Sequence, residues 1–212
     1  MCVLSPKSTY NPLDKKNLGE SIARALLAQP IHLLPPRLFS GAGIYAIYYG
    51  GDFPAYRVVA EANVPIYVGK AVPTGSRKGG ADLRAAKTVV YRRLMDHVES
   101  IQAVPSLQLS DFTYRALLLE DIWIPLGESL LIDMFTPVWN CVVDGFGNHD
   151  PGAGRYNQQR SPWDVLHPGR PWAEKCQATR LTPGVVAAQT QQADRETILQ
   201  SKTLRSHDLA LF

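Results

Sequence analysis

Two short stretches decide the fold, GIYAIYY at residues 43–49 and YVGK at residues 67–70. The first is rich in β-branched and aromatic residues and is followed by Gly50-Gly51, which predicts a strand that ends there. Because side chains alternate along a strand, its residues divide between two faces: Tyr45, Ile47 and Tyr49 on one, and Ile44, Ala46 and Tyr48 on the other. Residues 66–68 predict a second strand that ends at Gly69, so that the two stretches form a hairpin.

The remaining elements follow from caps, periodicity and proline positions. A helix is expected from Leu18 to Ala28 with Asn17 as its N-cap, and Pro30 and Pro35-Pro36 then favour an extended arm. Further predictions are a helix over residues 82–101, a strand over 112–119, a helix from Pro125 to Phe135, and a short strand end over 138–140.

Composition restricts the class of protein. Apolar residues make up 45% of the 212, enough for a packed core, and no run of about 18 apolar residues predicts a membrane span. The N-terminal residues carry no signal-peptide pattern. The three cysteines, Cys2, Cys141 and Cys176, lack a pairing pattern, which favours a reducing cytoplasm and argues against a structural zinc site.

The charges are unevenly distributed along the chain. Residues 67–100 hold seven Lys/Arg and three Asp/Glu, residues 101–150 hold one arginine and seven acidic residues, and residues 151–212 hold eight basic and five acidic residues. This order is typical of a protein that holds an anionic partner around a metal-binding carboxylate, although a mixed solvated surface is the plain alternative.

The two stretches resemble the paired signature of the GIY-YIG nuclease superfamily. Gly43-Ile44-Tyr45 and Tyr67-Val68-Gly69 correspond to its two tripeptides, and the match continues through Arg93, Glu128 and Asn140 in the family's order. The 21 residues between Tyr45 and Tyr67 form a longer gap than usual, which predicts an insertion at residues 51–63. The segments YVGKAVP, EDIWIPLGE and DGFGNHDPG look most like the type II restriction endonucleases of that superfamily.

The resemblance implies metal-dependent hydrolysis of a phosphodiester. The roles that it implies are Glu128 as the ligand of one divalent ion, usually Mg²⁺, Tyr45 as general base, Tyr67 as the group that positions water or phosphate, Arg93 as the stabiliser of phosphoryl charge, and Asn140 as an orienting group. Mg²⁺ keeps most of its waters and needs few protein ligands, so one carboxylate and a substrate phosphate suffice.

The general base needs assistance, because a phenol has a pKa near 10. His97 and Lys70 are the candidates to lower that pKa or to accept the proton. His97 lies four residues after Arg93, so the two share one edge of the apolar stripe of the helix. Packing roles for both residues, and a structural ion pair for Glu128, are the alternatives.

Several basic residues, within the core and beyond it, are candidates to bind DNA. The members of this set are Lys70, Arg77 and Lys78 in or next to the loop at 71–80, and Arg155, Arg160 and Arg170 beyond the core. His149 and Asp150 are neighbours in a glycine-rich loop and are expected to be structural rather than a second metal site.

These inferences predict an α+β fold, with a small, mainly antiparallel three-stranded sheet flanked by helices. We expect a helix and extended arm at residues 1–40, a nuclease-like core at 41–150 and a C-terminal extension at 151–212. The resemblance implies a Mg²⁺-dependent restriction endonuclease that acts on double-stranded DNA at a palindromic site, and the relatives that the chain most resembles suggest a GC-rich site such as CCGCGG. We expect the protein to act as a homodimer and to be cytoplasmic. A repair or homing nuclease, and a DNA-binding protein with a degenerate nuclease fold, remain the alternatives.

Overall fold

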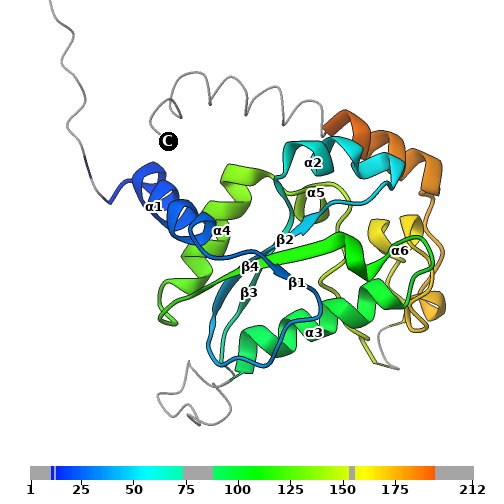
Figure 1. Ribbon diagram of the computed structural model, residues 1–212. Coiled ribbons are helices and arrows are strands. Elements are labelled where there is room, and N and C mark those ends of the chain that lie inside the picture. The colour runs from blue at the N-terminus through cyan, green and yellow to red at the C-terminus, as the bar shows by residue number, and fades with distance from the viewer. Residues whose placement is uncertain (1–10, 12, 74–87, 153–155, 194–212) are drawn as a thin grey trace, which may run out of the picture.

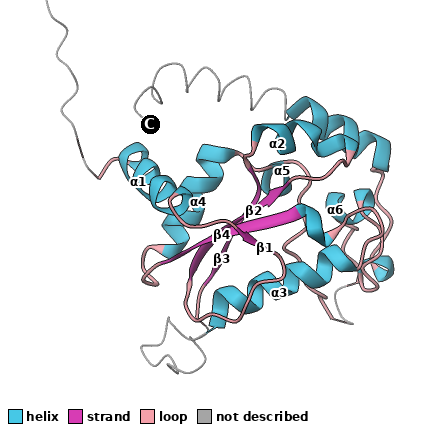
Figure 2. Ribbon diagram, viewed as in Figure 1, coloured by secondary structure: helices cyan, strands magenta, loops and turns pink. Residues whose placement is uncertain are grey.

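The computed structural model describes residues 11, 13–73, 88–152 and 156–193. It has the predicted α+β class, with helices on both faces of an antiparallel sheet (Figures 1 and 2). The sheet has four strands rather than three, in the order β1-β4-β2-β3. The strands are β1 His32–Leu33, β2 Gly43–Tyr49, β3 Pro65–Ala71 and β4 Phe112–Leu118.

Strand β2 is the buried centre of the molecule, and all seven of its residues are shielded from solvent. The predicted alternation is confirmed. Tyr45, Ile47 and Tyr49 belong to the larger of two hydrophobic clusters, and Ile44, Ala46 and Tyr48 belong to the smaller one on the opposite face. Both faces of the central strand are therefore buried in a hydrophobic cluster, which explains why its sequence is an uninterrupted apolar run.

Strand β3 continues past the point where the sequence predicted its end. Gly69 lies within the strand, opposite Tyr45, and pairing continues to Ala71 opposite Gly43. The insertion between β2 and β3 forms a single short helical unit, η1 Pro54–Tyr56 followed by α2 Arg57–Ala62. Asn63 ends this unit in the left-handed conformation with φ 51°.

Two of the predicted helices are found with shifted ends, and the predicted strand end near residue 140 is wrong. Helix α1 Lys15–Leu27 has Asp14 rather than Asn17 as its N-cap. Of the helix predicted over residues 82–101, residues 82–87 lie outside the described range, Thr88 is the N-cap, and the rest belongs to α3 Val89–Gln102. Helix α4 Ile124–Phe135 agrees closely. Residues 138–140 belong to a one-turn helix, α5 Val138–Cys141, because Thr136 adopts a left-handed conformation and reverses the chain.

The fourth strand comes from the N-terminal arm. Strand β1 pairs with β4, with His32 opposite Tyr114. The Arg115 guanidinium donates to the carbonyl oxygens of Leu27 and Gln29 and so ties the arm to β4 from the face on which α1 and α4 pack. The arm therefore packs on the core of the molecule.

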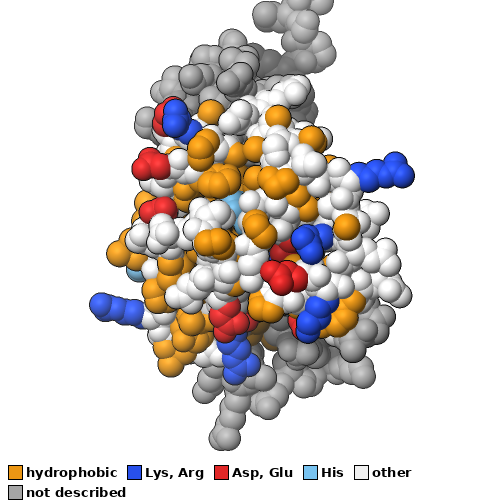
Figure 3. All heavy atoms as spheres, turned by 90° about the vertical axis from the view of Figure 1, so that its right-hand side faces the viewer, with side chains coloured by type: hydrophobic (Ala, Val, Ile, Leu, Met, Phe, Trp, Pro, Cys, Tyr) orange, Lys and Arg blue, Asp and Glu red, His pale blue; other side chains and the backbone are white. Residues whose placement is uncertain are grey.

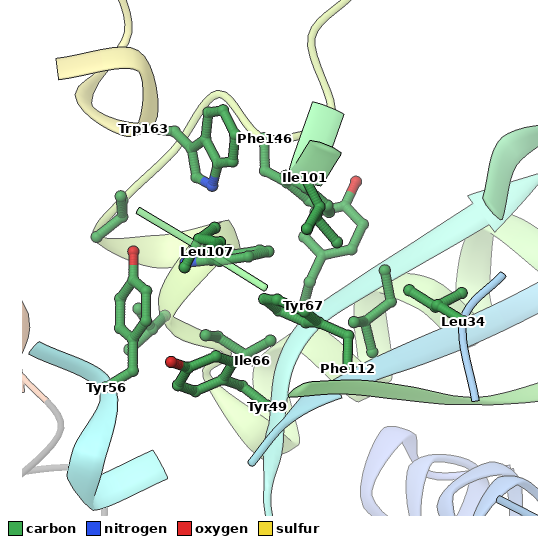
Figure 4. Close-up of a cluster of buried hydrophobic side chains, with 14 of the residues drawn as sticks. Leu34, Tyr49, Tyr56, Ile66, Tyr67, Ile101, Leu107, Phe112, Phe146 and Trp163 are labelled. Carbon is green, nitrogen blue, oxygen red and sulfur yellow. The ribbon is translucent and has the colours of Figure 1, made fainter. Parts of the chain in front are cut away.

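The described part of the C-terminal extension packs on the other face. It contains α6 Pro162–Leu166, η6 Ala173–Lys175 and helical residues 183–193. A short helix of the core, η4 Leu109–Asp111, directly precedes β4. Trp163 and Leu166 are buried in the same cluster as Tyr67 and Phe146 (Figure 4). The extension thus completes the core under the larger face of the sheet.

Among the described residues, no helix combines the length and apolar character needed to cross a bilayer. Figure 3 shows the face formed by the right-hand side of Figure 1, where side chains of both charge signs lie among apolar and neutral polar ones.

Candidate active site

The site is built around the hydroxyl group of Tyr45, at the centre of the larger face of the sheet. Tyr45 is fully buried and lies opposite Gly69 in the β2–β3 register. A Cβ atom at position 69 would lie 2.4 Å from the Tyr45 hydroxyl oxygen and 2.9 Å from the Tyr67 ring. Glycine is required here because two tyrosine rings occupy the space of a side chain.

His97 is the hydrogen-bond partner of Tyr45, with 2.7 Å between Nε2 and the hydroxyl oxygen. Burial, followed by the charge of Arg93, lowers the pKa of His97 well below its usual value. Burial, followed by Tyr67, raises the pKa of Tyr45 well above its usual value. Both groups are therefore neutral at neutral pH, and the tautomer of His97 sets which of the two donates this hydrogen bond.

Tyr67 is the second tyrosine of the site, with its ring centroid 6.3 Å from that of Tyr45 and 5.0 Å from that of His97. Burial raises its pKa, and the Arg93 charge acts in the opposite direction. Its hydroxyl lies against Gly147, where an added Cβ would be 2.7 Å away.

Arg93 projects from α3 between the buried tyrosines and solvent. Its side chain is 23% exposed, its NH2 group donates to the Gly147 carbonyl oxygen at 2.8 Å, and NH1 lies 3.7 Å from Asp96. The NH1 group also contacts His149 Nε2. The guanidinium charge lowers the pKa of both tyrosines, against the larger effect of burial.

Glu128 approaches from α4, which packs on β3 and β2. Its carboxylate accepts from the Lys70 ammonium group at 2.5 Å, and its side chain is 19% exposed. After the larger effects of burial and of nearby groups, the Glu128 charge raises the pKa of Tyr45 and of Tyr67. The structure therefore shows both features that the sequence suggested for Glu128, a carboxylate near the site and an ion pair.

Asn140 orients the strand that carries Tyr67. Its Oδ1 accepts from the Val68 amide at 2.8 Å, and its Nδ2 donates to the Val68 carbonyl at 2.9 Å. Since β3 is an outer strand of the sheet, the amide side chain takes the place of a neighbouring strand for one residue.

The residues predicted to bind DNA differ from one another in their surroundings. Lys70 is exposed but paired with Glu128, and the Arg160 guanidinium donates to the carbonyls of Ala173 and Glu174. Arg77, Lys78 and Arg155 lie outside the described residues. Arg170 is a correction: it is 2% exposed and bonds only within the protein in the described structure, so it is not presented to DNA.

The sequence missed the contribution of residues 145–148. Phe146 stacks on His97 with ring centroids 4.4 Å apart, and Gly147 contacts both Tyr67 and Arg93. The glycines of the DGFGNHD segment predict a loop, but they do not predict which residues this loop contacts. Among the described residues, no group of three or more His, Cys, Asp or Glu side chains could hold a metal ion, so the expected ion would rest on Glu128.

The comparisons identify the family. A family model described as the Eco29kI GIY-YIG domain matches residues 37–194, about three quarters of the chain. No curated protein matches the sequence. The chain belongs to the Eco29kI GIY-YIG family, a family of type II restriction endonucleases, and its match includes most of the segment that follows residue 150.

Proposed function

We propose that this member of the Eco29kI GIY-YIG family is a site-specific type II restriction endonuclease. It hydrolyses phosphodiester bonds of double-stranded DNA at a palindromic, GC-rich site, with Mg²⁺ and with Tyr45 as general base. The observation that carries this proposal is the hydrogen bond between Tyr45 and His97, which is buried beside the partly exposed Arg93.

The pair solves the problem of a phenol acting as a base at neutral pH. In the proposed step the Tyr45 proton passes to Nε2 of neutral His97 while the Tyr45 oxygen takes a proton from the attacking water. Burial opposes this transfer, because it raises the pKa of Tyr45 and lowers the pKa of His97, so the step depends on the negative charge of the bound phosphate, which favours the protonated imidazole. The new bond joins the water oxygen to phosphorus, and the bond to the leaving oxygen breaks. Since Tyr45 is fully buried, a small shift of the neighbouring side chains on DNA binding is part of this proposal.

Arg93 and Tyr67 surround the position of the phosphate. The guanidinium has further N–H donors beyond the one given to Gly147, and its planar fork suits two phosphoryl oxygens. Charge that develops on these oxygens is stabilised by a cation that the loop already holds in place.

Glu128 is the residue that would hold Mg²⁺. A single, partly exposed carboxylate fits an ion that retains most of its waters, and the Lys70 ammonium already shows that this carboxylate accepts a cation. When bound, the ion would neutralise charge on the phosphate and on the leaving oxygen. The ion pair with Lys70 holds the carboxylate at β3, the outer strand from which Lys70 projects.

A cleavage assay tests the proposal. Purified protein is incubated with supercoiled plasmid and with a bacteriophage genome, with Mg²⁺ or with EDTA, and the ends are sequenced. We expect discrete fragments only with Mg²⁺, and ends that share one palindromic sequence. Binding without cleavage in any divalent metal would instead support a degenerate nuclease fold, and cleavage without a shared sequence would support a repair-type nuclease.

The substitution Glu128→Gln separates catalysis from binding in the same assay. It preserves shape and removes only the charge, so cleavage should be lost while DNA affinity remains close to that of the wild type. Glu99→Gln, an exposed glutamate of α3, is the matched control and should cut normally. Normal cleavage by Glu128→Gln would show that Glu128 is not the metal ligand.

A further inference from the structure

Four successive backbone carbonyls next to the site are all bound by two arginines. The Arg170 guanidinium donates to the carbonyl oxygens of Gly145 at 2.9 Å, Phe146 at 3.2 Å and Asn148 at 3.1 Å. Arg170 does not donate to the Gly147 carbonyl oxygen, which instead accepts from Arg93 at 2.8 Å. One arginine of the candidate site and one from the C-terminal extension therefore bind the same short loop.

This loop, residues 145–148, forms the wall of the site. The Phe146 ring stacks on His97 at 4.4 Å and meets the edge of Tyr67 at 5.1 Å. Gly147 lies so close to the Tyr67 hydroxyl and to Arg93 that an added Cβ would be 2.7 Å and 3.3 Å from them. Any displacement of the loop would move three of the groups on which the proposed reaction depends.

Arg170 is itself held firmly. Its Nε donates to Asp164 at 2.7 Å, and its guanidinium lies 4.4 Å and 4.6 Å from the ring centroids of Trp163 and Trp172. Both members of the ion pair are nearly inaccessible to solvent, at 3% and 2% exposed side-chain area. A buried charge is retained only where it is paired and hydrogen-bonded, and here the planar guanidinium makes four hydrogen bonds, one to a carboxylate and three to backbone carbonyls.

We propose that Arg170 is a positioning residue for catalysis. It fixes the 145–148 loop so that the Gly147 carbonyl orients Arg93 and the Phe146 ring holds His97 against Tyr45. The extension beyond residue 150 therefore completes the catalytic site, in addition to covering the core. This inference rests on the proposed nuclease function, and its effects on the loop can be measured without it.

The test compares Arg170→Lys with the wild type. Lysine keeps the positive charge but cannot reach three carbonyls and a carboxylate in one plane. With saturating enzyme, we expect the single-turnover cleavage rate to fall by about 10-fold or more while DNA affinity changes little, since Arg170 is not exposed. In an Arg93→Lys background the same substitution should cause a smaller loss of rate than it does in the wild type, because one of its two routes passes through Arg93 and the other passes through Phe146 and His97.

Arg115→Lys is the matched control. Arg115 also bonds two backbone carbonyls and also ties a terminal extension to the core, but it does so on the opposite face. Thermal unfolding, measured for both variants, identifies any rate loss that is due to unfolded protein. Equal cleavage rates for folded Arg170→Lys and wild type, or rate losses that multiply fully in the double variant, would overturn the proposal.

A second readout does not depend on cleavage. In ¹H–¹⁵N spectra, Arg170→Lys should shift the Gly147 amide and the His97 ring signals, whereas Arg115→Lys should leave them in place. Absence of both shifts in a folded Arg170→Lys protein would refute the inference even if the wild type failed to cut DNA. Shifts without any wild-type cleavage would preserve the positioning role and refute the nuclease function.

Discussion

Tyr45 and His97 have opposite pKa shifts with the same leading cause. Burial disfavours the charged form of each group, so it raises the pKa of the phenol and lowers the pKa of the imidazole. The pair is therefore neutral over a wide pH range and can pass a proton without either group being charged beforehand. A solvent-exposed tyrosine would need to ionise near its ordinary pKa.

This leads to a prediction on the pH–rate profile. The relay requires unprotonated Nε2, so the acid limb of the profile should lie below pH 6.5, the ordinary value for histidine. His97→Gln keeps a hydrogen-bond acceptor but takes up no proton, so we expect a loss of about 10²–10⁴-fold in single-turnover rate and disappearance of that limb. Tyr45→Phe should lose rate by a similar factor.

Circular dichroism must first show that both variants are folded. A folded Tyr45→Phe protein with near-native cleavage would exclude the tyrosine as general base. An unchanged acid limb in His97→Gln would leave His97 with only a packing role beside Phe146.

His167 allows a separate prediction on stability. Its Nε2 lies 2.6 Å from the Tyr56 hydroxyl and its Nδ1 lies 2.7 Å from Ser106 Oγ, and burial lowers its pKa to about 3. The unfolded chain binds a proton near pH 6.5 and the folded chain does not, so stability is complete above that pH and falls as pH decreases toward 3.

At pH 4 the loss through His167 alone is roughly 3 kcal/mol, at about 1.36 kcal/mol per pH unit. In His167→Gln, the free energy of unfolding should be lower at pH 7 but should decrease less between pH 7 and pH 4. Chemical denaturation at both pH values measures this difference. An equal decrease in wild type and variant would mean that His167 is protonated in the folded protein.

At the scale of the elements, the β2–β3 pair positions the chemistry through close approach at its glycines. Gly43 lies so near β4 that a Cβ there would be 2.1 Å from the Leu117 carbonyl, and Gly69 allows Tyr45 to cross β3. The glycines of both signature stretches are thus explained by neighbours in space.

Gly69→Ala tests this explanation. The added methyl group would overlap the Tyr45 hydroxyl, and overpacking of this kind costs about 1–3 kcal/mol and displaces side chains. We expect a lower melting temperature and a rate loss larger than the loss of folded protein accounts for. Gly50→Ala, where an added Cβ would lie 3.8 Å from the Asp111 carbonyl oxygen, is the control and should retain both properties. Native activity of Gly69→Ala would show that Tyr45 is not held against this strand.

The same elements show what the sequence could predict and why the rest escaped. The period-2 pattern of β2 located the strand and both of its faces, and helical periodicity placed Arg93 and His97 on one edge of α3. Gly69 was wrongly taken as a strand end, because local propensity cannot distinguish a glycine that ends a strand from one that admits a distant ring. Arg170 was wrongly taken as a DNA contact, because its partners are carbonyls 22 to 25 residues away, which no side-chain pattern records.

At the scale of the whole molecule, both terminal segments complete the core and leave some apolar surface exposed. Near the arm, Ile31, Leu33, Leu38 and Leu118 are between 47% and 73% exposed, and β1 is an outer strand of the described sheet. Exposed apolar side chains beside an outer strand are typical of a surface that binds another chain. One chain supplies one Glu128, whereas a restriction enzyme must cut two strands, so we place a second copy on this surface.

The resulting prediction is a homodimer on a palindromic site. Two-fold symmetry of the protein would match that of the DNA, and each copy would cut one strand. Leu33→Glu combined with Leu38→Glu should give a 23.4 kDa monomer in light scattering and should convert double-strand cleavage into slow nicking. Val185→Glu, at a residue that is 46% exposed in the C-terminal helical segment, should remain dimeric.

DNA affinity of the wild type should fall steeply with salt, because phosphate contacts release counterions. Light scattering with a duplex that carries the mapped site gives the stoichiometry. A single wild-type chain per duplex that releases only nicked product would exclude the dimer, and a dimeric double variant would exclude the arm as its interface.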